Sequence, residues 1–181
     1  MSSRGPRGLR GMTEPQIQQR DALPYVAIRR EVTNGIPAVV DIAFPQLFAW
    51  LGQNGIAPAG PPFIRYLEVD HQGEPLEIEV AAPVGNGAPE GDDTVRADTL
   101  PAGRYATLIH TGPYRHDDVP DLVDAQAALR TWTEQQGIVT GRPSERGSSL
   151  AACVEYFRIG PPMEADWTKW ETELAYLVVE D

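Results

Sequence analysis

The chain has 181 residues, of which 41% are hydrophobic and 23% are charged, so it can build one domain, or two small fused repeats, around a core. Its formal net charge of −11 repels nucleic-acid phosphates and argues against direct nucleic-acid binding. The single cysteine, Cys153, excludes an internal disulfide and favours a reducing compartment. No apolar stretch approaches the length of a membrane span and no signal-peptide core follows the first arginines, so we expect a cytoplasmic protein without a membrane partner.

The first 13 residues are rich in Gly and Arg and have no hydrophobic period, which predicts a disordered tail before a folded domain over 14–181. Translation can start at Met1 or at Met12. In the first half of this domain the pattern indicates a helix over 36–53, with Pro37 in its first turn and a kink at Pro45. Strand patterns cover 16–20, 25–32, 62–69 and 76–84.

A Gly-, Pro- and Asp-rich segment over 86–93 predicts a linker between repeat one (14–85) and repeat two (94–181). Repeat two begins with a strand pattern over 94–111. A helix is predicted near 118–136, with Asp117 or Asp118 as its N-cap. Strands follow at 150–159 and 172–180, and 144–149 is typical of a loop.

The two halves repeat the same signals in the same order. Leu-Pro pairs, helical tryptophans followed by Gly-Ile, aromatic strand segments and acidic strand segments all occur twice, at Leu23/Leu100, Trp50/Trp132, Phe63–Tyr66/Val154–Phe157 and Glu77–Val80/Glu171–Leu174. Duplicated units pack about a pseudo-two-fold axis and form a groove where they meet. We therefore predict an α+β fold of two strand–helix–strand–strand modules with a ligand groove where they meet.

Matched glutamates are the first candidates for function. Strand alternation places Glu79 and Glu173 on the sheet face that the helices do not cover. A glutamate in the middle of a strand is disfavoured unless something uses it. The alternative, that this face is simply solvated, stays open.

Aromatic side chains favour a ligand-binding role over plain solvation. Six rings are candidates for the walls of a groove around the carboxylates: Tyr66, Tyr105, Tyr114, Tyr156, Trp167 and Trp170. Tyr66 and Tyr156 are interpreted as occupying matched strand positions. Rings around a carboxylate suit a flat, often cationic ligand, through stacking and cation–π attraction. Trp50 and Trp132 are expected to pack in the core instead.

Other chemistries find little support. His71, His110 and His116 lack the spacing of metal ligands, and no nucleotide-binding or nucleophile motif is present, so we predict neither a metal nor a cofactor. Cys153 is expected to be a buried small hydrophobe, and His110 to order the Gly112-Pro113-Tyr114 turn.

The motifs together resemble the GyrI-like small-molecule-binding domain, also called the effector-binding domain of AraC- and BmrR-type regulators. The segments that carry the resemblance are Leu100–Ala106, His110–Tyr114, the helix ending at Trp132 with Gly137, and Trp170–Leu174, within a match from about Glu14 to the end. The resemblance implies that the two modules form one antiparallel sheet, with the helices on one face and a ligand groove on the other. It also implies an acidic residue of the last strand, here Glu173 with Glu79 as its counterpart, that pairs with cationic aromatic effectors. The chain lacks a helix-turn-helix domain and is similar to standalone members.

Three functions remain open at this point. The first is binding, for sequestration or sensing, of a planar hydrophobic small molecule. The second is hydrolysis of the cyclopropane ring of alkylating natural products, with Glu173 as general base and Tyr114 or Tyr156 stabilising an oxyanion. The third is interaction with a protein partner such as gyrase or a separate regulator.

Overall fold

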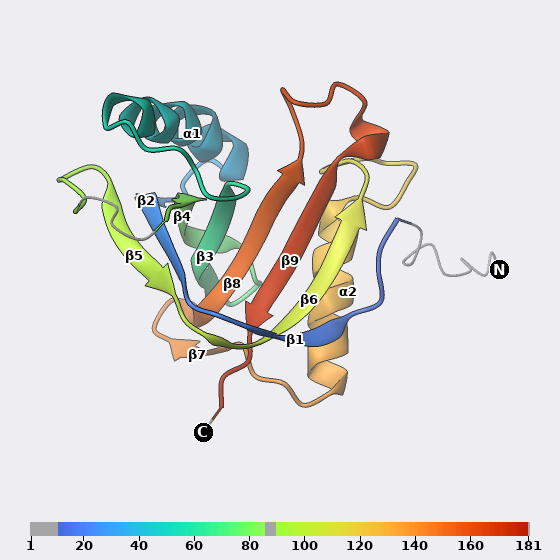
Figure 1. Ribbon diagram of the computed structural model, residues 1–181. Coiled ribbons are helices and arrows are strands. Elements are labelled where there is room, and N and C mark those ends of the chain that lie inside the picture. Colours follow the sequence, from blue (N-terminus) through green and yellow to red (C-terminus); the bar gives the residue numbers. More distant parts are fainter. Residues whose placement is uncertain (1–10, 86–89, 181) are drawn as a thin grey trace.

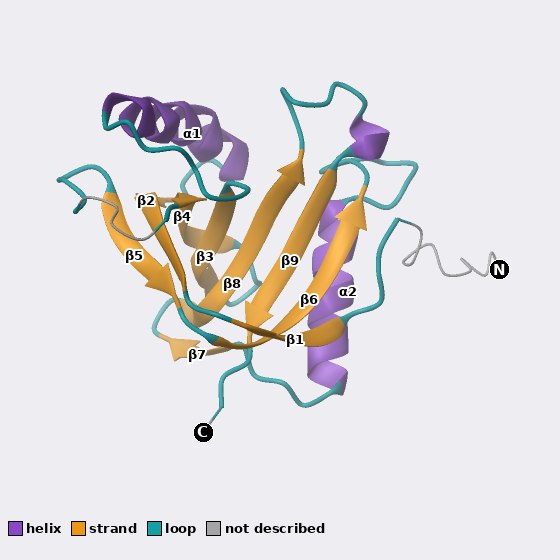
Figure 2. Ribbon diagram, in the orientation of Figure 1, coloured by secondary structure: helices purple, strands orange, loops and turns teal. Residues whose placement is uncertain are grey.

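The computed structural model describes residues 11–85 and 90–180, which form a nine-stranded antiparallel sheet with two helices (Figures 1 and 2). The first half contains β1 (Gln16–Arg20), β2 (Leu23–Glu31), α1 (Ile36–Gln53), β3 (Phe63–Asp70) and β4 (Pro75–Pro83). The second half contains β5 (Arg96–Leu100), β6 (Gly103–Thr111), α2 (Leu122–Gln135), β7 (Gly141–Ser144), β8 (Gly147–Ile159), a short 3-10 turn (Trp167–Lys169) and β9 (Glu171–Leu177). The predicted fold class, α+β with duplicated strand–helix–strand–strand modules, is confirmed.

The strand order is symmetric about the centre of the sheet. It runs β1-β6-β9-β8-β3-β4-β2-β5, with β7 paired to β8. The repeats meet at β8 and β3, and each strand has its counterpart at the same distance from this junction. The outermost strands are exchanged, because β1 pairs with β6 of the second repeat and β5 pairs with β2 of the first.

Both helices lie on one face of the sheet, and their apolar stripes explain why. In α1 the buried residues Ala43, Leu47 and Leu51 have helical spacing, and the helix packs on β4 and β2. Pro37 lies in its first turn as predicted. In α2 the buried Ala125 and Leu129 direct the helix onto β6 and β9. Within the described residues, neither helix is long and apolar enough to cross a membrane.

The predicted start of α2 at Asp117 or Asp118 was wrong. The N-cap is Asp121, whose carboxylate accepts a hydrogen bond from the backbone N–H of Asp124, while the Asp124 carboxylate accepts one from the backbone N–H of Asp121. This reciprocal pair satisfies two backbone donors that the first turn would otherwise leave free. A capping box therefore decides the boundary, not the nearest Asp before Pro120.

Two other segments differ from the sequence prediction. The single strand expected over 94–111 is two strands, β5 and β6, separated at Pro101, where the missing N–H cannot continue a ladder. The loop expected over 144–149 is the turn of a hairpin between β7 and β8.

The ends of the predicted tail and linker are in contact with the domain. Met12 forms an isolated bridge with His110, and the Thr13 N–H donates to the Ile109 carbonyl at 2.9 Å. Beside the linker, the Asp92 carboxylate accepts a hydrogen bond from the Trp50 indole at 2.9 Å. Residues 1–10 of the predicted tail and 86–89 of the predicted linker lie outside the described residues.

The two faces of the sheet have separate cores. The helix face carries two clusters, one under each helix, with Leu47 and Leu129 fully buried at their centres. The opposite face, which we call the inner face, is lined by Tyr25, Phe63 and Tyr105. The sheet curls toward this inner face, and Figure 1 shows β1 crossing in front of the lower part of the sheet and β5 at its left edge. The inner face is therefore largely a packed core.

Candidate functional site on the helix face

A buried carboxylate, Glu155 on β8, lies on the helix face close to where the repeats meet. Its side chain is 2% exposed. It accepts hydrogen bonds from the Tyr66 hydroxyl of β3, at 3.0 Å, and from the Gln126 amide of α2. No Lys, Arg or His pairs with it in the part of the chain that the structure describes. Glu155 is thus a buried acid held by two neutral donors.

This environment changes the acidity of Glu155 and its neighbours. Burial raises the pKa of Glu155 to about 7, although the hydrogen bonds from Gln126 and Tyr66 oppose the shift. Burial, together with the nearby Glu155 charge, also raises the pKa of Tyr114 to about 12 and the pKa of Tyr66 and Tyr176 well above the usual range. The three phenols therefore stay protonated at neutral pH, and the Tyr66 hydroxyl serves as a donor to Glu155.

A continuous series of rings runs along the helix face beside Glu155. Trp170 contacts Tyr114 with ring centroids 4.7 Å apart, and Tyr114 contacts Phe157 at 5.7 Å. Phe157 meets Phe44 of α1 at 6.1 Å, and Phe44 stacks on Phe48 at 6.0 Å. Apart from Phe48, which is 42% exposed, these rings are partly buried. The series connects the loop before β9 to α1 and presents aromatic surface close to a buried acid.

Close packing fixes Tyr114, the second ring of this series. A Cβ atom at Gly160 would lie 2.5 Å from the Tyr114 hydroxyl, so the tyrosine reaches over a position where only glycine leaves room. The Trp170 indole N–H donates to the Glu164 carbonyl at 2.7 Å, which sets the plane of the neighbouring ring. Both contacts come from the second repeat.

The site breaks the symmetry of the duplication. Glu155 lies directly opposite Ile64 in the β3–β8 ladder, and Ile64 is its counterpart in repeat one. Likewise Gln126 of α2 corresponds to Phe44 of α1, at the same spacing from the matched tryptophans. Sequence reasoning missed Glu155 because it stands inside an aromatic strand segment. The signal that could have found it is a charged residue where the other repeat has isoleucine.

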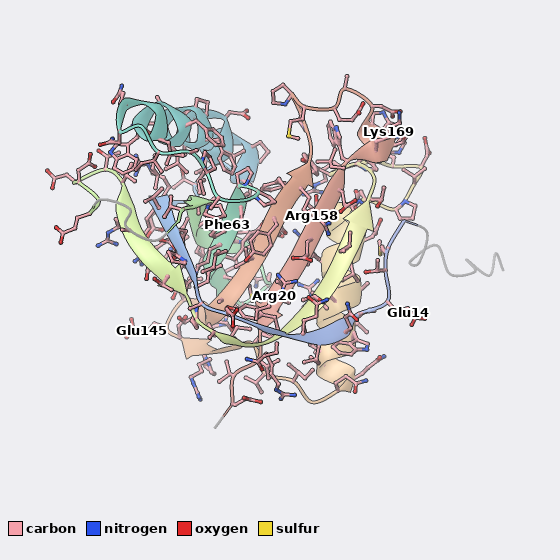
Figure 3. The ribbon with its side chains drawn as sticks, in the orientation of Figure 1. Glu14, Arg20, Phe63, Glu145, Arg158 and Lys169 are labelled. Carbon is pink, nitrogen blue, oxygen red and sulfur yellow. The ribbon has the colours of Figure 1, made fainter. Side chains whose placement is uncertain are left out.

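Glu79 and Glu173 lie on the inner face, where strand alternation placed them, and each has a cationic partner. Arg20 of β1 donates to Glu173 at 2.8 Å, and Figure 3 shows Arg20 in front of the central strands. Glu79 accepts a hydrogen bond from the Tyr25 hydroxyl at 2.6 Å and lies 3.8 Å from the Arg65 guanidinium. Both carboxylates therefore face away from Glu155.

The six rings predicted to line the groove lie in three different places. Tyr66, Tyr114 and Trp170 lie on the helix face near Glu155. Tyr105 and Tyr156 belong to the inner face. The interpretation of Tyr66 and Tyr156 as matched positions was wrong. With Ile64 and Glu155 as equivalent positions of the two repeats, the counterpart of Tyr66 is Phe157, two residues further along the strand.

Trp167, the remaining predicted ring, and the inner-face tyrosines Tyr105 and Tyr156 each contact other residues. Trp167 is 38% exposed and stacks on His116, with centroids 4.8 Å apart. The Tyr105 hydroxyl donates to the Pro101 carbonyl at 2.7 Å. Burial raises the pKa of Tyr156 to about 12, and the Arg20 guanidinium lies 6.0 Å from its ring centre.

The predictions that Cys153 is a buried small hydrophobe and that His110 orders a turn are confirmed. Cys153 is buried, and burial raises the pKa of its thiol to about 12, which makes it a poor nucleophile. His110 is fully buried, and its Nε2 lies 3.0 Å from the Pro113 carbonyl in the turn it was expected to order. Among the residues of 11–85 and 90–180, no three His, Cys, Asp or Glu side chains gather as metal ligands.

Comparison with known families decides the relationship. The model of the GyrI-like small molecule binding domain matches residues 13–145, which is most of the chain. The chain belongs to the GyrI-like family. No curated protein matches it by sequence.

Solved structures agree with this GyrI-like fold. The C-terminal domain of EcmrR is similar with a TM-score of 0.69 and 18% identity, over 93% of this chain and 98% of that one. EcmrR in a DNA complex gives a TM-score of 0.75 at 18% identity over 96% of this chain, which spans 59% of the EcmrR chain. A hydrolase from Listeria innocua gives 0.58 at 12% identity, over 92% of each chain. At these identities the similarity shows the fold alone.

Proposed function

We propose that this GyrI-like domain binds planar, hydrophobic cations on its helix face, with Glu155 as the counter-charge. The observation that carries the proposal is the burial of Glu155 without a cationic partner among the described residues. Taking a carboxylate out of water costs free energy, and the raised pKa of Glu155 expresses that cost. A bound cation would offset it.

The surrounding rings supply the rest of the recognition. Aromatic faces attract cations and stack on flat ligands, and each such contact contributes about 0.5–2 kcal/mol. Tyr114 and Phe157 lie in the ring series, and Tyr66 donates directly to the carboxylate. A ligand that is flat, apolar and positively charged satisfies both the rings and the acid.

Gln126 is the group that a ligand would displace. Its amide is the polar contact that α2 makes with Glu155. In repeat one the same helical position is Phe44, which closes onto Phe157. We expect a cation to take the place of the Gln126 amide, so a shift of the α2 side chains accompanies binding.

Glu173 and Glu79 are the competing carboxylates. Glu173 is paired with Arg20 at 2.8 Å and Glu79 lies 3.8 Å from Arg65, so a ligand cation would have to replace an arginine at either. The sequence prediction of Glu173 as the central acid stays a prediction and is tested with Glu155 in the same experiment.

Titration with planar aromatic cations such as ethidium and acriflavine, followed by tryptophan quenching and calorimetry, tests the proposal. Trp170 touches Tyr114 and reports on the ring series. Glu155→Gln should weaken binding at least tenfold, and Glu173→Gln should change it less than twofold. The reverse order would move the site to the inner face. No binding of any cation would overturn the proposal.

A hydrolase is the second candidate, and the pKa of Glu155 favours it. A general base works best with a pKa near the operating pH, and that of Glu155 is about 7. Glu155 would take a proton from water as the oxygen attacks a strained cyclopropane carbon. The ring C–C bond at that carbon breaks, and its electron pair passes to a conjugated carbonyl of the alkylator, whose oxyanion the protonated Tyr114 hydroxyl would stabilise. Mass spectrometry of a cyclopropane-bearing alkylator incubated with the protein tests turnover, and hydrolysis that survives Glu155→Gln would exclude this base.

Interaction with gyrase or a separate regulator stays a prediction that a pull-down at low and high salt tests.

A further inference from the structure

The inner face of the first repeat carries a pocket of a different chemistry. It has a volume of about 520 Å³ and lies between β2, β3, β4 and β5, on the opposite side of the sheet from Glu155. Its lining is mainly charged and consists of Arg29, Arg65, Leu67, Glu79, Arg96, Ala97 and Asp98. With three arginines and two acids the lining carries a net positive charge, in a chain whose net charge is −11.

The strand register brings the arginines together. Glu79 on β4 lies directly opposite Arg29 on β2 and directly opposite Arg65 on β3. Arg96 on β5 pairs with Ala27, two residues before Arg29 on the same face of β2. Strands β2, β3 and β5 therefore each place one arginine on the inner face around the pocket. Arg65 lies 3.8 Å from the Glu79 carboxylate, whereas the Arg29 guanidinium pairs with Glu77.

The fold itself does not require arginines at these positions, because the corresponding positions around Glu173 are occupied by other residues. The residues directly opposite Glu173, the counterpart of Glu79, are Ile109 and Tyr156. At the position that corresponds to Arg96, β1 has Gln16 opposite Thr107. Glu173 is satisfied by a single arginine, Arg20. In the pocket, Arg65 pairs with Glu79 and Arg29 pairs with Glu77, so Arg96 is the arginine without a carboxylate partner among the described residues.

Hydrogen-bond donors in the pocket are left without acceptors. Arg65 donates to the Tyr25 hydroxyl at 2.8 Å and to the Ala151 carbonyl at 2.9 Å, but its buried Nε–H has no partner among the described residues. Arg96 is exposed and makes no side-chain hydrogen bond or ion pair with any described residue. A buried donor without an acceptor is unfavourable, and an oxyanion is the acceptor that guanidinium groups bind best.

The acids in the lining define the rest of the ligand. Glu79 and Asp98 lie beside the arginines and repel a bulky polyanion, but they accept hydrogen bonds from hydroxyl or ammonium groups. The pocket therefore suits a small molecule that carries an anionic group and donors together.

We propose that this pocket binds the carboxylate or phosphate group of a small polar metabolite, with Arg65 and Arg96 as its donors. This second site is independent of the cation site on the helix face, and the two differ in charge and in polarity. The sheet separates them, since the pocket is on the inner face of β2–β5.

Arginine side-chain NMR tests the proposal directly. The Arg65 Nε–H resonance is followed while inorganic phosphate, acetate or lactate is added at constant ionic strength. We expect a saturable shift with at least one anion, and the comparison of phosphate with the two carboxylates distinguishes the group that is bound. Lactate should bind more tightly than acetate if its hydroxyl donates to Glu79 or Asp98.

Matched variants distinguish a specific anion site from general electrostatic attraction of anions by arginines. Arg96→Gln installs the residue of the corresponding β1 position and should weaken binding about tenfold. Arg30→Gln removes the same charge from the adjacent strand β2 but on its other face, and should leave binding unchanged. Equal losses in both variants, or the absence of a saturable shift with all three anions, would overturn the proposal.

Discussion

Glu155 and Ile64 lie directly opposite each other in the ladder that joins the two repeats. They are also the same position of the duplicated unit, so one helix-face core position holds a carboxylate in one copy and an isoleucine in the other. The scaffold is symmetric, and the buried carboxylate of the proposed cation site is present in one copy alone.

Glu155 should make stability depend on pH. Its pKa is raised from roughly 4.3 in an unfolded chain to about 7, so the native state holds the proton more tightly. Its favourable contribution is complete below about pH 4 and is lost as pH rises through 7. Relative to wild type, Glu155→Gln should therefore gain roughly 2–3 kcal/mol between pH 4 and pH 8. Urea unfolding across this range measures it, with Glu134→Gln on exposed α2 as control. A constant difference would contradict the prediction.

Cation binding should strengthen as pH rises. Only the ionised form of Glu155 offers a counter-charge, and this form becomes dominant above about pH 7. The dissociation constant for an aromatic cation should fall about tenfold from pH 6 to pH 8. Calorimetry at several pH values measures the trend, and Glu155→Gln should abolish it. A trend that persists in this variant would identify another titrating group.

Gly160→Ala should disturb the ring series. The new methyl group would meet the Tyr114 hydroxyl at 2.5 Å, and Trp170 and Phe157 hold that ring from two sides. We expect a loss of about 1 kcal/mol of stability and weaker ligand binding.

Thermal denaturation measures the Gly160→Ala effect, and a second change tests its cause. Adding Tyr114→Phe removes the clashing oxygen and leaves the ring carbon at 3.8 Å, which is ordinary contact, so stability should recover. Gly52→Ala in α1 is the control. Nothing lies within 4 Å of its added methyl group, and alanine should stabilise the helix by about 0.5–1 kcal/mol.

The Arg20–Glu173 pair should anchor β1 to β9. Its side chains are 24% and 15% exposed, and Arg20 also donates to Gln18 at 2.7 Å. Arg20→Met should cost about 1–3 kcal/mol, because it leaves a half-buried carboxylate without a partner. A double-mutant cycle with Glu173→Gln measures the coupling. The exposed Arg104–Glu180 pair is the control, with an expected coupling below about 1 kcal/mol.

The sequence predicted the scaffold well because periodicity and duplication are local signals. The matched Leu-Pro pairs, tryptophans and glutamates were enough to indicate two modules and a shared antiparallel sheet. The helix boundary at Asp121 was missed because three aspartates precede α2, and only the reciprocal bond with Asp124 selects one. The hairpin turn between β7 and β8 was taken for a loop because its strand β7 is short and contains proline.

The site was harder to predict, since it depends on which face of the sheet each side chain occupies. Tyr66 and Tyr156 differ by one position in the repeat, and in a strand one position moves a side chain to the opposite face. Glu79 and Glu173 were located correctly on the inner face, but their arginine partners come from other strands. Glu155 carries no separate motif, and only its burial distinguishes it.

The exchange of β1 and β5 between the repeats has a consequence for how the domain assembles. Neither half is complete alone, because the edge strand of each sheet half is supplied by the other half of the chain. Two polypeptides, 11–85 and 90–180, should therefore complement each other in trans and restore the domain when they are mixed. A single copy would leave one edge open and one strand unpaired, which a second identical copy can satisfy.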